Sequence, residues 1–539
     1  MIDCRYFAFG LALILTPCSM TLADARADPR LSNSLGASDL DEIRAQVQIN
    51  RGSEDLPPVQ QAYLKASNTD EGDRFAWDGA VAVDGDTVVI GAHYEGSDST
   101  GINGDEANND ADRSGAVYVF VRSGGSWSQQ AYLKASNTNA LDQFGRSVAI
   151  DGDTIVVGAK FESSNATGVN GDQDNNIASA SGAAYVFVRS NGSWSQQAYL
   201  KASNTGFVDQ FGISVAIDGD TVAIGAPSED SNAKGVNGDQ SNNLASDSGA
   251  VYVFVRNGGS WSQQAYIKAS NTDAADEFGS VVALSGDTLS VSARFEDSKT
   301  TSVNGNDNDN DAEDAGAVYV FFRSEENWSQ QAYLKASNAE AGDIFGHSIA
   351  IDEDTIVVGA HLEDSNAMGV SGDESNNDAE FAGAAYVFTR SGGDWSQQAY
   401  LKASNNEEDD RFGTAAAVYG DTLVISSFEG SNATGVNGNQ TINFASRSGA
   451  AYMFTRSANS WTQQAYLKAS NTEVQDQFGA SMALAQDTVV IGARFEDSNA
   501  TGVNGDQANN EADGAGSAYV FDLAPIADTV FVDRFRSTP

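Results

Sequence analysis

The octapeptide QQAYLKAS, or a close variant of it, occurs seven times in this chain of 539 residues. A second marker, a phenylalanine that glycine follows in six of seven cases, recurs with the same period of about 67 residues. The seven tyrosines of the first marker are Tyr63, Tyr132, Tyr199, Tyr266, Tyr333, Tyr400 and Tyr466, and the seven phenylalanines are Phe75, Phe144, Phe211, Phe278, Phe345, Phe412 and Phe478. Such regularity predicts one supersecondary unit that buries its apolar faces against neighbouring copies.

The third copy shows what each unit contains. Apolar runs at 214–217 and 221–225 flank Asp218-Gly219, a pair suited to a type I′ hairpin turn. After a polar loop, runs at 250–256 and 261–268 flank a second turn, so each unit predicts four antiparallel strands. The third run is apolar on both faces, whereas the fourth alternates polar and apolar residues, as expected of an outermost strand. We therefore predict an all-β seven-bladed β-propeller and disfavour a β-solenoid, for which the unit is long.

The order of the markers predicts how the ring closes. The first QQAYLKAS precedes the first phenylalanine marker, and the last unit lacks a fourth strand of its own. The N-terminal copy can therefore complete the last blade, which removes two open sheet edges.

The flanks and the composition indicate an exported protein. Residues 1–23 have the basic residue, short apolar run and small-residue end of a signal peptide, and residues 24–58 are polar, with a short helix expected at 39–47. The propeller is expected at 59–523 and a tail at 524–539, and both cysteines lie in the signal segment. The formal net charge of −45 argues against binding nucleic acid or an anionic membrane surface, and no later segment is long and apolar enough to span a membrane.

The repeats resemble the FG-GAP family, the units of the integrin α-chain propeller and of many bacterial surface proteins. Phe211-Gly212 and Gly225-Ala226-Pro227 spell the signature in the third copy, and elsewhere the proline is replaced, for example by His93, Lys160, Arg294, His361 and Arg494. The resemblance implies a seven-bladed propeller that binds partners outside the cell. The acidic calcium loop between the first two strands of cation-binding members is absent, because that connection is here a tight turn.

The loop between the second and third strands is the main candidate for chemistry. An acidic position opens it in every copy, and a second Asp or Asn follows about ten residues later. Carboxylate and amide oxygens at short spacing suit Ca²⁺, but the same residues also shape turns by bonding their own backbone, and both interpretations stay open. The candidate calcium ligands are Glu95, Asp105, Glu162, Asp172, Glu229, Asp239, Glu296, Asp307, Asp309, Asp311, Glu363, Asp373, Glu496 and Asp506.

Other recurrent residues are expected to be structural. An aspartate two residues before each phenylalanine marker, such as Asp142, should accept backbone N–H bonds between blades. Asp153 and its equivalents follow the first hairpin turn, and a tryptophan such as Trp194 at the start of the fourth strand should pack, although sugar stacking is the alternative. The three histidines are expected to pair with nearby acids.

We expect no catalytic site, because the units are nearly equivalent and no nucleophile–base set stands out. The sequence favours a monomeric, secreted or cell-surface binding or adhesion protein, with an extracellular protein or glycan as partner and Ca²⁺ as a candidate aid to its contacts. A purely structural envelope protein is the first alternative. A glycan-active hydrolase or lyase using two acids is the second.

Overall fold

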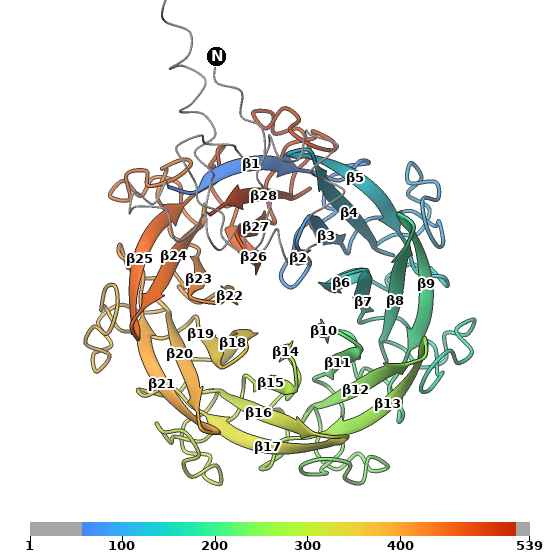
Figure 1. Cartoon of the computed structure of the whole chain (residues 1–539), viewed down its shortest axis with the longest axis horizontal. Coiled ribbons are helices and arrows are strands. Elements are labelled where there is room, and N and C mark those ends of the chain that lie inside the picture. The colour runs from blue at the N-terminus through green and yellow to red at the C-terminus, as the bar shows by residue number, and fades with distance from the viewer. Residues whose placement is uncertain (1–56, 524–539) are drawn as a thin grey trace, which may run out of the picture. The chain divides into compact units, whose positions relative to one another are not determined.

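The computed structural model describes residues 57–523, which form seven four-stranded antiparallel sheets arranged around an axis (Figure 1). Blade 1 contains β2 (Val81–Asp84), β3 (Thr87–Ala92), β4 (Ala116–Ser123) and β5 (Ser126–Leu133), and blade 2 contains β6 (Phe144–Asp151), β7 (Thr154–Ala159), β8 (Ala183–Ser190) and β9 (Ser193–Leu200). Blade 3 contains β10 (Val215–Asp218), β11 (Thr221–Ala226), β12 (Ala250–Asn257) and β13 (Ser260–Ile267), and blade 4 contains β14 (Val282–Ser285), β15 (Thr288–Ala293), β16 (Ala317–Ser324) and β17 (Asn327–Leu334). Blade 5 contains β18 (Phe345–Asp352), β19 (Thr355–Ala360), β20 (Ala384–Ser391) and β21 (Asp394–Leu401), and blade 6 contains β22 (Ala416–Tyr419), β23 (Thr422–Ser427), β24 (Ala450–Ser457) and β25 (Ser460–Leu467).

Blade 7 confirms the predicted closure. It consists of β26 (Phe478–Ala485), β27 (Thr488–Ala493) and β28 (Ser517–Asp522), and β1 (Val59–Leu64) pairs antiparallel with β28 as its outer strand. Blue β1 therefore lies beside red β28 in Figure 1. The predicted signal peptide, the helix at 39–47 and the tail lie outside the described residues.

The apolar core lies between adjacent blades. The cluster between blades 7 and 1, for example, joins Val490 and Val520 to Phe75 and Phe120. The FG glycine permits this close packing: Gly145 has a φ of +84°, and a Cβ there would meet the Ala116 carbonyl oxygen at 2.4 Å.

Two local expectations need correction. The first hairpin turn of blade 3 is centred on Gly219-Asp220 and not on Asp218-Gly219, and only Gly219 has a positive φ, so this turn is not type I′. The second hairpin is the one with positive φ at both central residues, as at Gly258 and Gly259.

The outer strand is less exposed than its alternating pattern suggested. Tyr266 and Lys268 point inward and are almost fully buried. A bulge in β13 leaves Gln264 out of register with β12, and this glutamine accepts a hydrogen bond from Trp328 Nε1 of blade 4 at 2.8 Å. Polar side chains of the outer strand therefore make contacts within their own blade and with the next blade.

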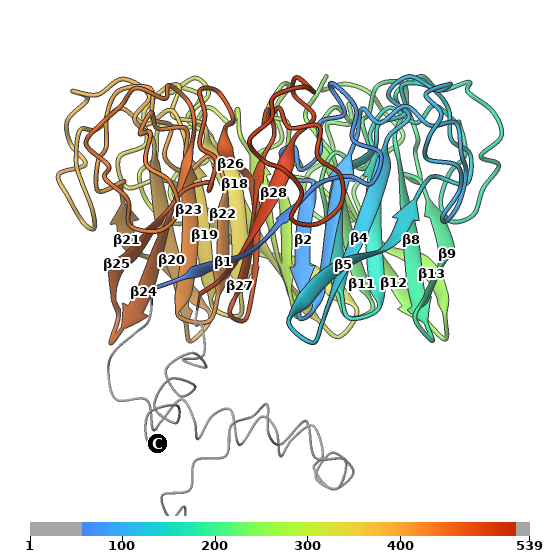
Figure 2. The ribbon, with the colours of Figure 1, turned by 90° about the horizontal axis from the view of Figure 1, so that it is seen from above.

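The two faces of the ring differ (Figure 2). The long loops between the second and third strands and the connections between blades gather on one face, which we call the loop face. The short hairpins lie on the opposite face, which we call the hairpin face. This arrangement follows from antiparallel strands in sequence order, because the connections after the second and the fourth strand leave the same end of the blade.

Candidate functional site

The recurrent glutamate that opens each long loop is buried and paired with a lysine of the same blade's outer strand. In blade 2, Glu162 Oε2 lies 2.9 Å from Lys201 Nζ, and both side chains are fully buried. The separation is 2.8–3.0 Å in all seven blades. The pairs are Glu95–Lys134, Glu162–Lys201, Glu229–Lys268, Glu296–Lys335, Glu363–Lys402, Glu429–Lys468 and Glu496–Lys65.

Further donors satisfy the remaining oxygen of each glutamate. Glu162 Oε1 accepts hydrogen bonds from Asn137 Nδ2 at 3.0 Å and from the Ser164 backbone N–H at 3.2 Å. Asn137 comes from the connection that leaves blade 1, so the network fastens the outer strand to its loop and one blade to the next. Buried ion pairs persist where such extra hydrogen bonds compensate for desolvation, and we regard these pairs as structural.

The loop aspartates occupy a different environment from these glutamates. Asp172 is exposed, and its Oδ1 accepts the backbone N–H of Asp174 at 3.1 Å. The same turn forms at Asp105, Asp239, Asn306, Asp373, Asn439 and Asp506. This is the turn-shaping behaviour that the sequence allowed as the alternative to calcium binding.

The densest acidic loop, in blade 4, follows the same principle. Asp309 accepts the Lys299 backbone N–H at 3.0 Å, Asp311 pairs with the Lys299 ammonium, and Asp307 accepts from Ser270 Oγ at 3.1 Å. Within residues 57–523, no three His, Cys, Asp or Glu side chains are grouped so that they could hold a metal ion. The structure therefore does not bring the glutamates and the loop aspartates together, and calcium binding by these loops stays a prediction.

The aspartates before the phenylalanine marker have the structural role that was expected. Asp142 Oδ2 accepts the Asn139 backbone N–H at 3.1 Å, and the equivalent bond forms in every blade connection. Burial, followed by the nearby charge of Glu162, raises the pKa of Asp142 to about 8. Because these aspartates and the loop glutamates are buried, neither set contributes to the exposed acidic surface of the loop face.

On the hairpin face, the recurrent tryptophan packs between blades. Arg189 stacks over Trp194 with 5.0 Å from its guanidinium carbon to the ring centroid, and its Nε donates to Asp153 at 2.6 Å. Trp194 Nε1 donates to Gln130 of blade 1 at 2.8 Å. Trp194 is thereby enclosed, which fits the packing role rather than sugar stacking.

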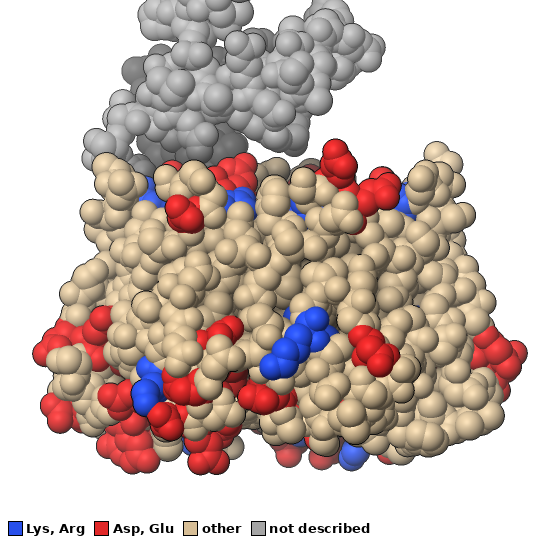
Figure 3. Space-filling model, turned by 90° about the horizontal axis from the view of Figure 1, so that it is seen from below, with Lys and Arg blue, Asp and Glu red and all other residues tan. Residues whose placement is uncertain are grey.

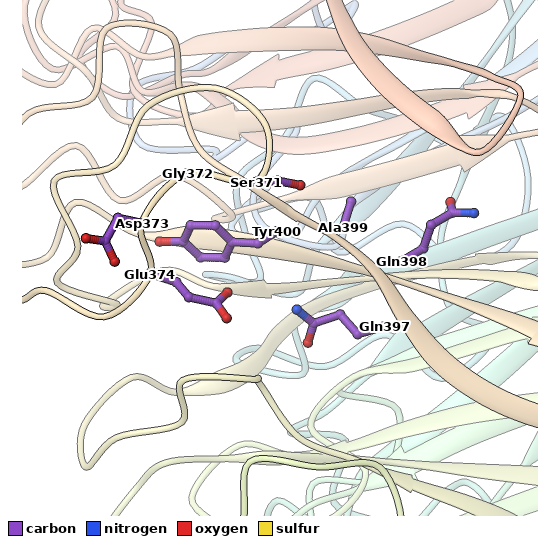
Figure 4. A pocket seen from close by; sticks show the side chains of 8 residues that line it. All are labelled: Ser371, Gly372, Asp373, Glu374, Gln397, Gln398, Ala399 and Tyr400. Carbon is purple, nitrogen blue, oxygen red and sulfur yellow. The ribbon is translucent and has the colours of Figure 1, made fainter.

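On the side of the ring seen in Figure 3, exposed acidic side chains are densest toward the loop face, at the lower edge of the view. A shallow pocket on the flank of blade 5 is lined by Asp373 and Glu374 from the loop and by Gln397 and Tyr400 from β21 (Figure 4). Glu374 accepts from Ser337 Oγ at 2.9 Å, and Gln397 donates to the same Ser337 oxygen at 2.7 Å. These polar groups are joined to one another in a structural network.

Comparison with known proteins agrees with this architecture. The FG-GAP repeat family model matches seven segments, residues 58–120, 127–187, 194–254, 261–321, 328–388, 395–454 and 461–521. No curated protein matches the chain. None of residues 57–523 forms a helix long and apolar enough to cross a membrane. Because the seven matches cover most of the sequence, and each spans the outer strand of one blade and the first three strands of the next, this chain belongs to the FG-GAP repeat family of β-propellers.

Proposed function

We propose that this chain is an exported, non-enzymatic binding protein that contacts an extracellular protein or glycan through its loop face. The fold is one that typically serves binding and adhesion, which supports the general class. The choice of the loop face rests on a separate observation, namely the distribution of exposed apolar side chains.

Nine of the eleven large hydrophobic residues that are strongly exposed belong to loop-face segments. They are Leu141, Ile177, Phe207, Val208, Leu244, Met368, Ile442, Phe444 and Val474, whereas Val59 lies in the outer strand β1 and Tyr419 at a hairpin. Exposed apolar groups that gather on one face are typical of interaction surfaces.

Some of these residues lie in two neighbourhoods on the ring, one at the loop of blade 2 and one at the loop of blade 6. Val208 donates its backbone N–H to Ser179 in the loop of blade 2, which also carries Ile177. Similarly, Gln475, next to Val474, bonds to Ser446 near Phe444 of blade 6. Phe207 and Phe444 are 66% and 84% exposed, so each neighbourhood offers an aromatic anchor within an acidic surround. The combination best suits a partner with basic and apolar groups.

Binding to immobilised extracellular matrix proteins and polysaccharides tests this proposal. A Phe207→Ser/Phe444→Ser variant should lose at least tenfold in affinity for any partner found. Tyr419→Ser is the matched control, because it removes an aromatic residue that is 45% exposed on the hairpin face. Equal binding by the two variants would exclude the loop face. Failure of the wild type to bind any of them would favour the structural alternative, and turnover of a polysaccharide would favour the hydrolase or lyase.

A further inference from the structure

Two positions of the repeat vary strongly although the blades are otherwise alike. One follows the FG marker at the beginning of each inner strand, and the other follows the second strand, at the same end of the blade. The first position holds Trp77, Arg146, Ile213, Ser280, His347, Thr414 and Ala480, and the second holds His93, Lys160, Pro227, Arg294, His361, Phe428 and Arg494. Both lie at the loop-face end of the two inner strands of each blade, and the innermost strands surround the axis (Figure 1).

Side chains at these positions reach residues of neighbouring blades. Arg494 of blade 7 forms an ion pair with Asp78 of blade 1 at 2.5 Å, and Arg146 of blade 2 donates to the Asp78 carbonyl oxygen. The charges of Arg494 and of Arg294, which belongs to blade 4, act on Arg146 and help to lower its pKa, after desolvation. Blades 2, 4 and 7 are not neighbours, and their inner strands face one another only across the axis. Arg74 and Arg411 come from a third position, directly before the phenylalanine marker. The charge of Arg74 acts on His93, and that of Arg411 acts on His347 and His361. We call Arg74, Arg146, Lys160, Arg294, Arg411 and Arg494, with the histidines His93, His347 and His361, the axial cluster.

The six Lys and Arg side chains of the axial cluster outnumber the two acids that pair with them, Asp78 and Glu277. This excess of positive charge occurs in a chain whose formal net charge is −45. Two of its arginines have acidic partners: Arg494 pairs with Asp78, and Arg294 pairs with Glu277 at 2.6 Å. The charge of Asp513 acts on Arg74 and favours its charged form, but the two side chains form no ion pair. Lys160 and Arg411 form no ion pair within residues 57–523, although both side chains are partly buried. Burial, followed by the charges of Arg146 and Arg294, lowers the pKa of Lys160 to about 8.

Several donors of the cluster also lack hydrogen-bond partners among the described residues. These are Nε and Nη1 of Arg74 and Nε of Arg411, all three buried from solvent. His93 is only 3% exposed, and its Nδ1 has no partner either. The histidines therefore do not pair with acids as the sequence suggested; instead, the rings of His347 and His361 lie 3.6 Å apart.

Aromatic rings hold two of the guanidinium groups close together. The guanidinium carbon of Arg74 lies 4.8 Å from the Trp77 centroid, and that of Arg494 lies 4.4 Å from the same centroid. Both also stack on Phe495, at 4.5 and 5.3 Å. Like charges held side by side with unpaired donors form an arrangement that an anion would stabilise.

We infer that the axial cluster is a binding site for a small ligand bearing carboxylate or phosphate oxyanions, with Arg74, Arg146, Lys160 and Arg411 as its main cationic contacts. Guanidinium groups present planar pairs of donors that match both oxyanions. Because the cations come from blades on different sides of the axis, a ligand with more than one anionic oxygen cluster fits best. This site is distinct from the outer loops of the proposed function and does not depend on it.

Isothermal titration calorimetry of the full chain with citrate and with inorganic phosphate, at pH 7 and low ionic strength, tests the site. We expect saturable binding of at least one anion and a tenfold or greater weakening in Lys160→Gln/Arg411→Gln. Lys234→Gln is the matched control, because Lys234 is an exposed loop-face lysine outside the cluster. Binding of citrate alone assigns a carboxylate ligand, and binding of phosphate alone assigns a phosphate ligand.

Thermal melting provides the second measurement, because it does not require that the variant bind. The double variant should melt no lower than the wild type without anion, since it loses two unpaired cations, and it should lose the anion-dependent rise in melting temperature that the wild type shows. The inference is overturned if neither anion binds the wild type, or if the double variant binds as tightly as Lys234→Gln.

Discussion

Replacing Lys201 by methionine would test the buried ion pairs that fasten each outer strand. The substitution leaves the Glu162 carboxylate buried without its ammonium partner, which stood 2.9 Å away. Removing one member of a buried pair costs about 3–5 kcal/mol. The hydrogen bonds from Asn137 and Ser164 remain, so we expect the lower half of that range. For a ring of about 470 residues that unfolds as one unit, an unfolding entropy of about 1 kcal/mol per kelvin converts this loss to a melting temperature lowered by about 3–4 °C.

Differential scanning calorimetry measures the shift, and two companion variants identify its cause. Glu162→Gln/Lys201→Met removes both charges and should recover most of the loss. Asp153→Asn in the same blade breaks the pair with Arg189, in which the Asp153 side chain is 66% exposed, and should cost less than about 1 kcal/mol. The reasoning is refuted if Lys201→Met is as mild as Asp153→Asn, or if the double variant is no more stable than Lys201→Met.

Four further expectations follow from other parts of the ring. Because the pKa of Asp142 is raised to about 8, the folded ring binds more protons than the unfolded chain between about pH 4 and 8; this contribution to stability should fall as pH rises through that window, and Asp142→Asn should flatten the decline in melting temperature. Glu353 has a φ of 49° at a turn position where five blades have glycine, so Glu353→Gly should gain about 0.5–1 kcal/mol in urea unfolding. Since the loop glutamates are held by lysines, EDTA should move the melting temperature by less than about 1 °C, and a larger drop that CaCl₂ reverses would establish calcium in the loops. Deleting residues 1–66 should expose the edge of β28 and leave Glu496 without Lys65, giving aggregates in size-exclusion chromatography, whereas a monomeric, fully folded product would contradict the closure.

The sequence alone was sufficient to predict the architecture, because every blade repeats the same pattern of turn residues and apolar strands. Hairpin turns, two-sided apolar strands and the displaced first QQAYLKAS predicted four strands per blade and closure by β1, and the pairing of Val59 with Asp522 confirms it. The sequence also predicted the backbone hydrogen bonds of the interblade aspartates such as Asp142, because the two partners are only three residues apart.

Only the tertiary structure decided what the other recurrent polar residues do. Glu162 and Lys201 are 39 residues apart. The sequence around an acid at the start of a polar loop is the same whether that acid faces solvent or a buried ammonium. The axial cluster is harder still to foresee, because Arg146, Arg294 and Arg494 sit in separate repeats, and nothing in one repeat specifies what faces it across the ring. Local periodicity fixes strands and turns, whereas burial and the identity of a charge's partner depend on how distant segments meet in space.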